Sequence, residues 1–67
     1  MNRVKFKLKF KDTNQEWLLE GPNVREKSSN YHSILNKAIT EARAKKGELY
    51  IYNKNGSLKE VVKYYLV

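Results

Sequence analysis

The chain has 67 residues and no cysteine, and its 14 Lys and Arg against 7 Asp and Glu give a net charge of +7. This length predicts a single domain with a small core, and disulfides and thiolate metal sites are excluded as support for it. A composition of 40% hydrophobic and 31% charged residues excludes the disordered class. With no run near the roughly 18 apolar residues of a membrane span and no apolar signal segment, we expect a cytoplasmic protein.

The first predicted element is a strand over residues 4–11, VKFKLKFK, where an apolar residue alternates with a lysine four times. Side chains alternate between the two faces of a strand, so one face is apolar and the other is basic. The apolar face consists of Val4, Phe6, Leu8 and Phe10. The basic face consists of Lys5, Lys7, Lys9 and Lys11.

A turn and a return strand follow. Residues 12–15, DTNQ, are turn formers, and residues 16–20 predict a second strand with Trp17 and Leu19 on the core side. The Gly-Pro-Asn sequence at 21–23 ends this strand. Residues 24–27 are compatible with a short continuation strand, and residues 28–30 with a loop.

A helix over about residues 32–46 is predicted by an apolar stripe with helical spacing: Tyr31, Ile34, Leu35, Ala38 and Ala42. Asn30 or Ser33 is the candidate N-cap. Gly47 stands where a left-handed residue ends many helices, so we expect that conformation there.

The segment 48–53 alternates again, with Leu49 and Ile51 toward the core and Tyr50 and Tyr52 away from it. The Asn-Lys-Asn-Gly sequence at 53–56 predicts a hairpin, with the last strand starting near residue 57. A two-residue turn would pair Ile51 with Glu60. A four-residue loop would pair Ile51 with Leu58 and keep both on the core face, and we prefer that register.

The predicted order is strand, strand, helix, strand, strand, which indicates an α+β fold. We expect a small antiparallel β-sheet (ββαββ) with one amphipathic helix packed on one face. The predicted core is Val4, Phe6, Leu8, Phe10, Trp17, Leu19, Ile34, Leu35, Ala38, Ala42, Leu49, Ile51 and Leu58.

Several segments resemble a family of short bacterial and phage proteins, domain of unknown function twenty-one eighty-eight. They are Trp17-Leu18-Leu19, Ala38-Ile39 with Ala42-Arg43, Gly47-Glu48-Leu49-Tyr50-Ile51 and Asn55-Gly56-Ser57-Leu58. The resemblance covers about residues 15–62. It implies the same layout of strands and helix, and it implies no chemistry, cofactor or site residues.

The sequence argues against catalysis. His32 is the single histidine of the chain, and the nearby serines, Ser28, Ser29 and Ser33, are explained as capping groups at a helix start. The acids show no pair spaced for shared-proton chemistry or for a metal cage, and the glycines form no phosphate-binding loop. We therefore expect a protein that is not an enzyme, with no cofactor, metal site or small-molecule substrate.

The basic face of the first strand gives the first binding hypothesis. Four lysines at every second position span about 20 Å of strand, which permits contacts with successive phosphates. Tyr50 and Tyr52 would share that face and could stack on bases. We therefore hypothesise that these residues bind nucleic acid weakly and independently of its sequence. The structural alternative is a solvated lysine face with tyrosines packed across strands.

The C-terminal residues give the second hypothesis, because apolar side chains there occupy both faces of the predicted strand: Val61, Tyr64, Tyr65, Leu66 and Val67. A half-buried strand alternates, so this end is either covered on both sides or waits for a partner. The pattern predicts a protein-interaction module or a homodimer, of the kind expected in a bacterial or phage regulator. A frayed end is the structural alternative.

Overall fold

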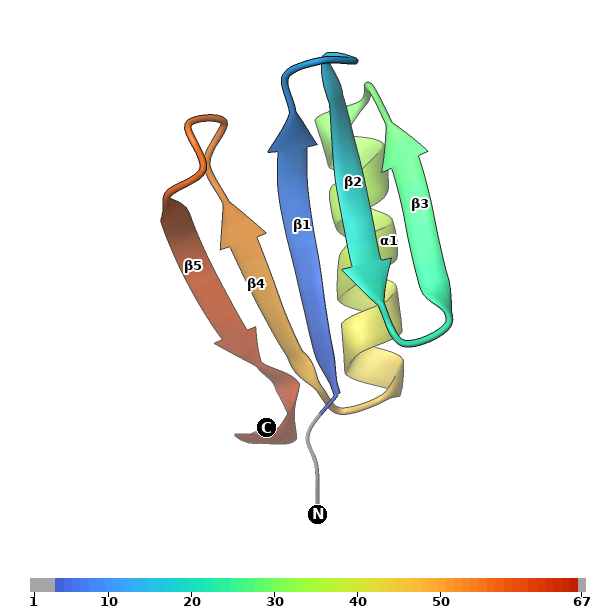
Figure 1. Ribbon diagram of the computed structural model, residues 1–67. Helices are drawn as coiled ribbons and strands as arrows, with labels where there is room; N and C mark the ends of the chain where they lie inside the picture. The colour runs from blue at the N-terminus through green and yellow to red at the C-terminus, as the bar shows by residue number, and fades with distance from the viewer. Residues whose placement is uncertain (1–3, 67) are drawn as a thin grey trace.

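The computed structural model describes residues 4–66, which form a five-stranded sheet with an α-helix on one face (Figure 1). The strands are β1 (Lys5–Lys11), β2 (Glu16–Gly21), β3 (Val24–Ser28), β4 (Glu48–Tyr52) and β5 (Leu58–Lys63). Helix α1 spans Tyr31–Ala44, and a 3-10 helix, η1, spans Tyr64–Leu66. The predicted α+β class, with a helix packed on one face of the sheet, is confirmed.

The sheet is mixed, with the strand order β3-β2-β1-β4-β5. Central strands β1 and β4 are parallel, and every other neighbouring pair is antiparallel. The prediction of a wholly antiparallel sheet is therefore wrong at the central pair. The reason is that residues 24–28 form a full strand, so three strands precede the helix rather than two.

This third strand sets the direction of β4. An odd number of antiparallel strands leaves the chain at the end of the sheet where β1 finishes (Figure 1). The 14 residues of α1 then cover about 21 Å, close to the roughly 23 Å length of the seven-residue β1. The helix thus returns the chain to the start of β1, where β4 enters parallel to it.

The core lies between α1 and the sheet. Its buried members are Phe6, Leu8, Trp17, Leu19, Ile34, Ala38, Ala42, Leu49 and Ile51. Helix positions 34, 38 and 42 supply one side of this layer, and two of them are alanines, which lets the helix approach the strands closely. The predicted core residues Val4, Phe10 and Leu35 are partly buried and pack against it. Trp17 lies between Phe10 and Tyr31, with ring centroids 5.1 and 4.6 Å away.

The prediction that Leu58 belongs to the core is wrong, because Leu58 is 51% exposed. The preferred register also fails: Ile51 pairs with Glu60, and Leu58 pairs with Tyr52. An irregularity between Ile51 and Tyr52 leaves one extra residue in β5, which turns Leu58 to the face away from the helix. The hairpin itself is present at residues 53–57, closed by the Asn53 N–H donating to the Ser57 carbonyl at 2.8 Å.

The two ends of α1 are capped by local hydrogen bonds. Asn30 is the N-cap, as one of the two candidates predicted, and its side-chain oxygen accepts the Ser33 N–H at 3.0 Å. At the other end Lys46, not Gly47, takes the left-handed conformation, with φ of 50°. The Lys46 and Gly47 N–H groups donate to the Arg43 and Ala42 carbonyls, as in a Schellman motif.

Gly47 is required for a different reason than the one predicted. A Cβ atom at this position would overlap the carbonyl oxygen of Val4, which approaches from the start of β1. This close approach allows a backbone hydrogen bond, because the N–H of the next residue, Glu48, donates to the same oxygen at 2.8 Å. Gly47 thus permits backbone contact, whereas Lys46 carries the backbone strain.

We expect opposite effects from substitutions at these neighbouring positions. Lys46→Gly should raise the free energy of unfolding by about 1 kcal/mol, because the left-handed conformation disfavours a side chain. Gly47→Ala should lower it by about 1 to 3 kcal/mol, because the new methyl group overlaps backbone. Urea unfolding followed by Trp17 fluorescence measures both. A stabilising Gly47→Ala would contradict the assigned roles.

Candidate nucleic-acid interface

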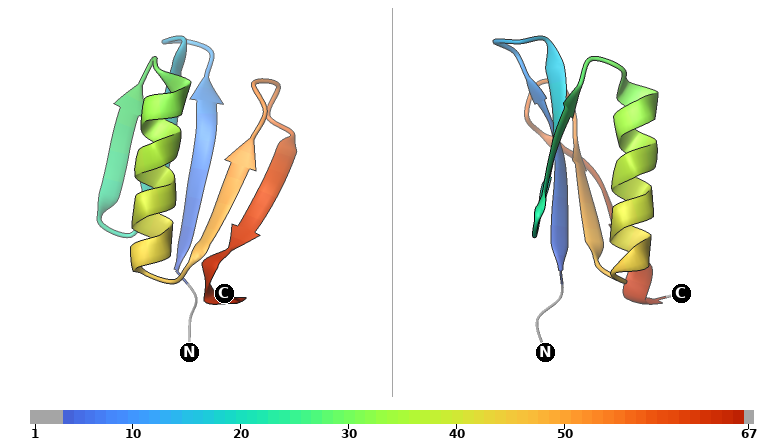
Figure 2. Two further views of the ribbon diagram at one scale, coloured as in Figure 1. Left: turned by 180° about the vertical axis from the view of Figure 1, so that it is seen from behind. Right: turned by 90° about the vertical axis from the view of Figure 1, so that its right-hand side faces the viewer.

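The lysines of β1 project from the face of the sheet opposite the helix. The side view in Figure 2 shows α1 on one side of the sheet and no element covering the other. We call this uncovered side the open face. Because Phe6 and Leu8 are buried under the helix, the alternating lysines on β1 must point to the open face. They are Lys5, Lys7, Lys9 and Lys11.

The parallel pairing of β1 with β4 places the predicted tyrosines beside these lysines. Lys7 is directly opposite Tyr50, and Lys5 is opposite Glu48. Tyr52 lies two residues further along β4, on the same face as Tyr50. The fold therefore brings the two separately predicted sets of residues onto adjacent strands.

Other strands extend the basic surface and also interrupt it. Further cations on the open face are Arg25, Lys27 and Lys63, and acids are Glu16, Glu20 and Glu48. Lys59 points elsewhere, since its Nζ lies 5.9 Å from the ring centroid of Tyr31 on the helix side. Arg3, a further cation just before β1 in the sequence, lies outside the described residues. Lysines thus dominate the centre of the face, but they do not form an unbroken patch.

Of these acids, Glu20 forms an ion pair with the lysine row. The Lys9 Nζ is 3.5 Å from Glu20 Oε1, and both side chains are well exposed. An exposed pair of this kind contributes about 0 to 1 kcal/mol to stability. Lys9 can therefore exchange this carboxylate for a phosphate at little cost.

A recess of about 270 Å³ opens on this part of the molecule. It is lined by Lys7, Lys9, Phe10, Tyr52, Asn53 and Gly56. Tyr52 carries an aromatic ring and the two lysines carry positive charges, and all three residues line the same hollow. Among the predicted binding residues, these three share a concave site; Tyr50 does not line it.

Tyr50 has a different role, because its hydroxyl donates to Glu48 Oε1 at 2.8 Å. Tyr65 donates to Glu48 Oε2 at the same distance. Glu48 is 7% exposed, and this carboxylate between two tyrosines was not predicted from the sequence. A glutamate beside alternating tyrosines was the available signal, but Tyr65 is 17 residues away and only the fold brings it near.

These hydrogen bonds shift the acidity of the groups. The bonds from Tyr65 and Tyr50 lower the pKa of Glu48, helped by the charges of Lys5 and Lys63 and opposed by burial. The bond to Glu48 raises the pKa of Tyr50, since the carboxylate holds the phenolic proton. Glu48 is therefore charged at neutral pH and fixes both rings.

Leu18 is an apolar residue on the open face, yet it is 1% exposed. Its cross-strand neighbours are Lys9 on β1 and Lys27 on β3. Because lysines lay their aliphatic stems over apolar surface while their charges stay in water, we infer that these two cover Leu18. Part of the lysine row therefore has a structural role as well.

The predicted C-terminal interface is divided among several environments. Val61 is half-buried opposite Tyr50, and Tyr64 packs against the core. Tyr65 binds Glu48, whereas Leu66 is 72% exposed. Val67 lies outside the described residues. A 3-10 helix has about three residues per turn, so η1 directs successive side chains differently and accounts for the lost alternation.

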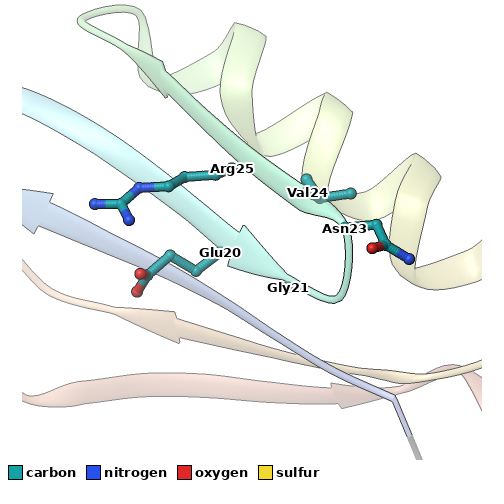
Figure 3. Close-up of a pocket in the computed structure, with 5 residues that line it drawn as sticks. All are labelled: Glu20, Gly21, Asn23, Val24 and Arg25. Atoms are coloured by element: carbon teal, nitrogen blue, oxygen red, sulfur yellow. The ribbon is translucent and has the colours of Figure 1, made fainter.

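A second hollow lies at the turn between β2 and β3 (Figure 3). It measures about 450 Å³ and is lined by Glu20, Gly21, Asn23, Val24 and Arg25. Figure 3 shows the Glu20 and Arg25 side chains on the same side of the hairpin, as expected from their cross-strand pairing. With one acid and one base, this hollow has no charge preference and offers no aromatic surface.

Comparison with known proteins adds no identification. No protein-family model matches the chain, and no curated protein or solved structure gives a significant match. The resemblance to domain of unknown function twenty-one eighty-eight stays a prediction. Within residues 4–66, no helix is long and apolar enough to cross a membrane. The same residues contain no group of three or more His, Asp or Glu that could hold a metal ion.

The lowered pKa of Glu48 predicts a dependence of stability on pH. Its ordinary value is 4.5, so its contribution is complete above that pH and is lost as the pH falls through the lower folded-state value. Glu48→Gln removes this titration. We expect its thermal midpoint to fall less on acidification below pH 4.5 than that of the wild type. Equal slopes for the two proteins would show that Glu48 is not stabilised as a carboxylate.

Proposed function

We propose that the protein is a non-catalytic module that binds nucleic acid weakly and without sequence preference through its open face. The observation that supports this best is the recess shared by Tyr52, Lys7 and Lys9. An aromatic ring beside two cations matches a nucleotide, which carries a base next to a phosphate. The net charge of +7 favours approach to any polyanion.

The shape of the recess favours single-stranded nucleic acid. Bases of a duplex are stacked inside the helix, so an aromatic side chain in a hollow can receive only an unpaired base. The other lysines of β1 lie in a line that a flexible strand can follow. Tyr50 adds a ring on the same face, but its hydroxyl is held by Glu48, so Tyr52 is the better candidate for stacking.

We expect Tyr52→Ala to weaken the binding of an oligo-dT probe by about 1 to 3 kcal/mol, the usual contribution of one stacked base. Fluorescence anisotropy at about 50 mM salt measures this affinity, since phosphate contacts are strong at that concentration. Tyr50→Phe is the matched control, because it keeps a ring on the same face. No binding of the wild type to single or double strands would reject the proposed function.

The contacts of the lysines with phosphates should be detected by the salt dependence of the binding affinity. With about four phosphates contacted, log affinity for a single strand should fall against log salt with a slope near −2.8. Replacing Lys7 and Lys9 by serine should reduce the steepness by about 1.4, because two contacts are removed. Tyr52→Ala should leave the slope unchanged. An unchanged slope in the double lysine variant would separate these lysines from phosphate binding.

The second candidate function is protein interaction or homodimerisation through the C-terminal edge. Leu58 and Leu66 are exposed apolar residues on β5 and η1, and β5 is an edge strand available for pairing with another chain. This candidate predicts concentration-dependent association in sedimentation experiments. Leu58→Ser with Leu66→Ser should abolish it, whereas a wild type that remains monomeric at high concentration would exclude self-association.

A further inference from the structure

The helix side of the molecule contains a hollow that is separate from the open face. Seen from behind in Figure 2, α1 does not cover β5, which lies at the edge of the sheet. Near the C-terminal end of the helix, a hollow of about 570 Å³ is lined by Ile39, Arg43, Lys46 and Tyr64. These residues come from α1, from the turn that follows it and from η1.

The floor of the hollow is apolar and fixed. Ile39 and Tyr64 are partly buried, and both pack against the core cluster. The backbone of Tyr64 is also anchored, because its N–H donates to the Gly47 carbonyl at 2.9 Å. An apolar group entering here would meet a surface that is already ordered, so little conformational freedom would be lost on binding.

The rim of the hollow is basic. Arg43 and Lys46 are exposed, and the ion pairs found within residues 4–66 join Lys9 to Glu20 and Lys37 to Glu26. Neither rim cation takes part in them. Arg43 is free to hold a carboxylate with two parallel hydrogen bonds, the strongest geometry for such a pair.

The backbone of Lys46 is a second, independent observation. A left-handed lysine is strained where glycine would fit easily, and the lysine side chain lines the hollow. Interaction of cations with the helix C-terminus does not require a lysine here, since Lys45 and Arg43 already supply positive charge to that end. The helix cap explains the left-handed backbone, but it does not explain why this position carries a lysine that lines the hollow.

We propose that this hollow binds a segment of an acidic partner protein, with an apolar side chain on Ile39 and Tyr64 and a carboxylate on Arg43 and Lys46. Charge complementarity selects this occupant. A second copy of the chain is a poorer occupant of this hollow, because its net charge of +7 does not complement the basic rim. Arginine and tyrosine are also among the residue types that most often anchor protein interfaces.

Nucleic acid fits this hollow less well than it fits the open face. The floor of the hollow consists of Ile39 and of Tyr64, which packs on the core. A nucleic-acid strand instead needs successive cations along its backbone. The hollow is lined by residues of α1, of the turn after it and of η1, whereas the lysine row lies on the sheet face opposite the helix. This site is therefore independent of the proposed nucleic-acid interface, and both can be occupied at once.

The test is a titration of the full chain, labelled with nitrogen-15, with an end-blocked synthetic peptide of leucine and glutamate with serine spacers. Backbone amide signals of Ile39, Arg43, Lys46 and Tyr64 should shift first. The same peptide with glutamine in place of glutamate should cause much smaller shifts. Equal shifts with both peptides, or shifts confined to other residues, would overturn the proposal.

Variants then test the rim. Arg43→Gln combined with Lys46→Gly should weaken binding of the glutamate peptide by about fivefold or more, since two charge-assisted contacts are lost. Lys45→Ser is the matched control, because it removes a neighbouring cation that does not line the hollow. Far-ultraviolet circular dichroism confirms that each variant is folded. If Lys45→Ser weakens binding as much as the double variant, general electrostatic attraction explains the peptide binding and the proposal fails.

An oligo-dT titration separates the two proposals. We expect it to shift amides of β1 and β4 and to leave those of Arg43, Lys46 and Tyr64 unchanged. If oligo-dT shifts the residues of the hollow instead, the hollow is a nucleic-acid site and the acidic-peptide proposal is rejected. Absence of oligo-dT binding, with peptide binding retained, would reject the proposed function alone.

Discussion

The contact between Gly47 and the backbone of Val4 is the constraint on which the arrangement of this protein depends. Three elements meet there: α1 ends in the preceding turn, β4 begins at the next residue, and η1 is anchored through the Gly47 carbonyl. The Glu48 N–H and the Val4 carbonyl form the first link between β4 and β1. Because a side chain at Gly47 would occupy the position of that carbonyl, the parallel register of the central strands depends on its absence.

The parallel register in turn determines the chemistry of the open face. It aligns Lys7 on β1 with Tyr50 on β4. Tyr52 then lies at the end of β4, where it lines the recess. Glu48 then distinguishes the two tyrosines, since it binds the hydroxyl of Tyr50 and leaves Tyr52 in the hollow. A buried carboxylate that is satisfied by two hydroxyl groups is stable, and it also ties η1 to the sheet through Tyr65.

A structural role and the proposed binding role fall on the same residue, Lys9. Leu18 is buried on the face away from the helix, and its cross-strand neighbours are Lys9 and Lys27. We infer that their aliphatic stems cover it while their charges remain in water. The helix side combines roles in a similar way at Arg43, which interacts favourably with the end of α1 and forms part of a basic rim. A small chain with a positive charge of +7 can thus present two distinct cationic surfaces on opposite sides of one sheet.

The sequence by itself determined the local elements, because alternation in VKFKLKFK, helical spacing at residues 34, 38 and 42 and the Asn30 cap are short-range signals. It therefore predicted the α+β class, most of the core and the common face of the lysines. Tertiary structure decided the direction of β4, because pairing of β3 reverses the path of the chain before the helix. It also decided the exposure of Leu58 and the burial of Glu48, which depend on a strand irregularity and on a tyrosine distant in sequence. Alternation assigns a residue to a face, but only the packing of distant segments decides what that face contacts.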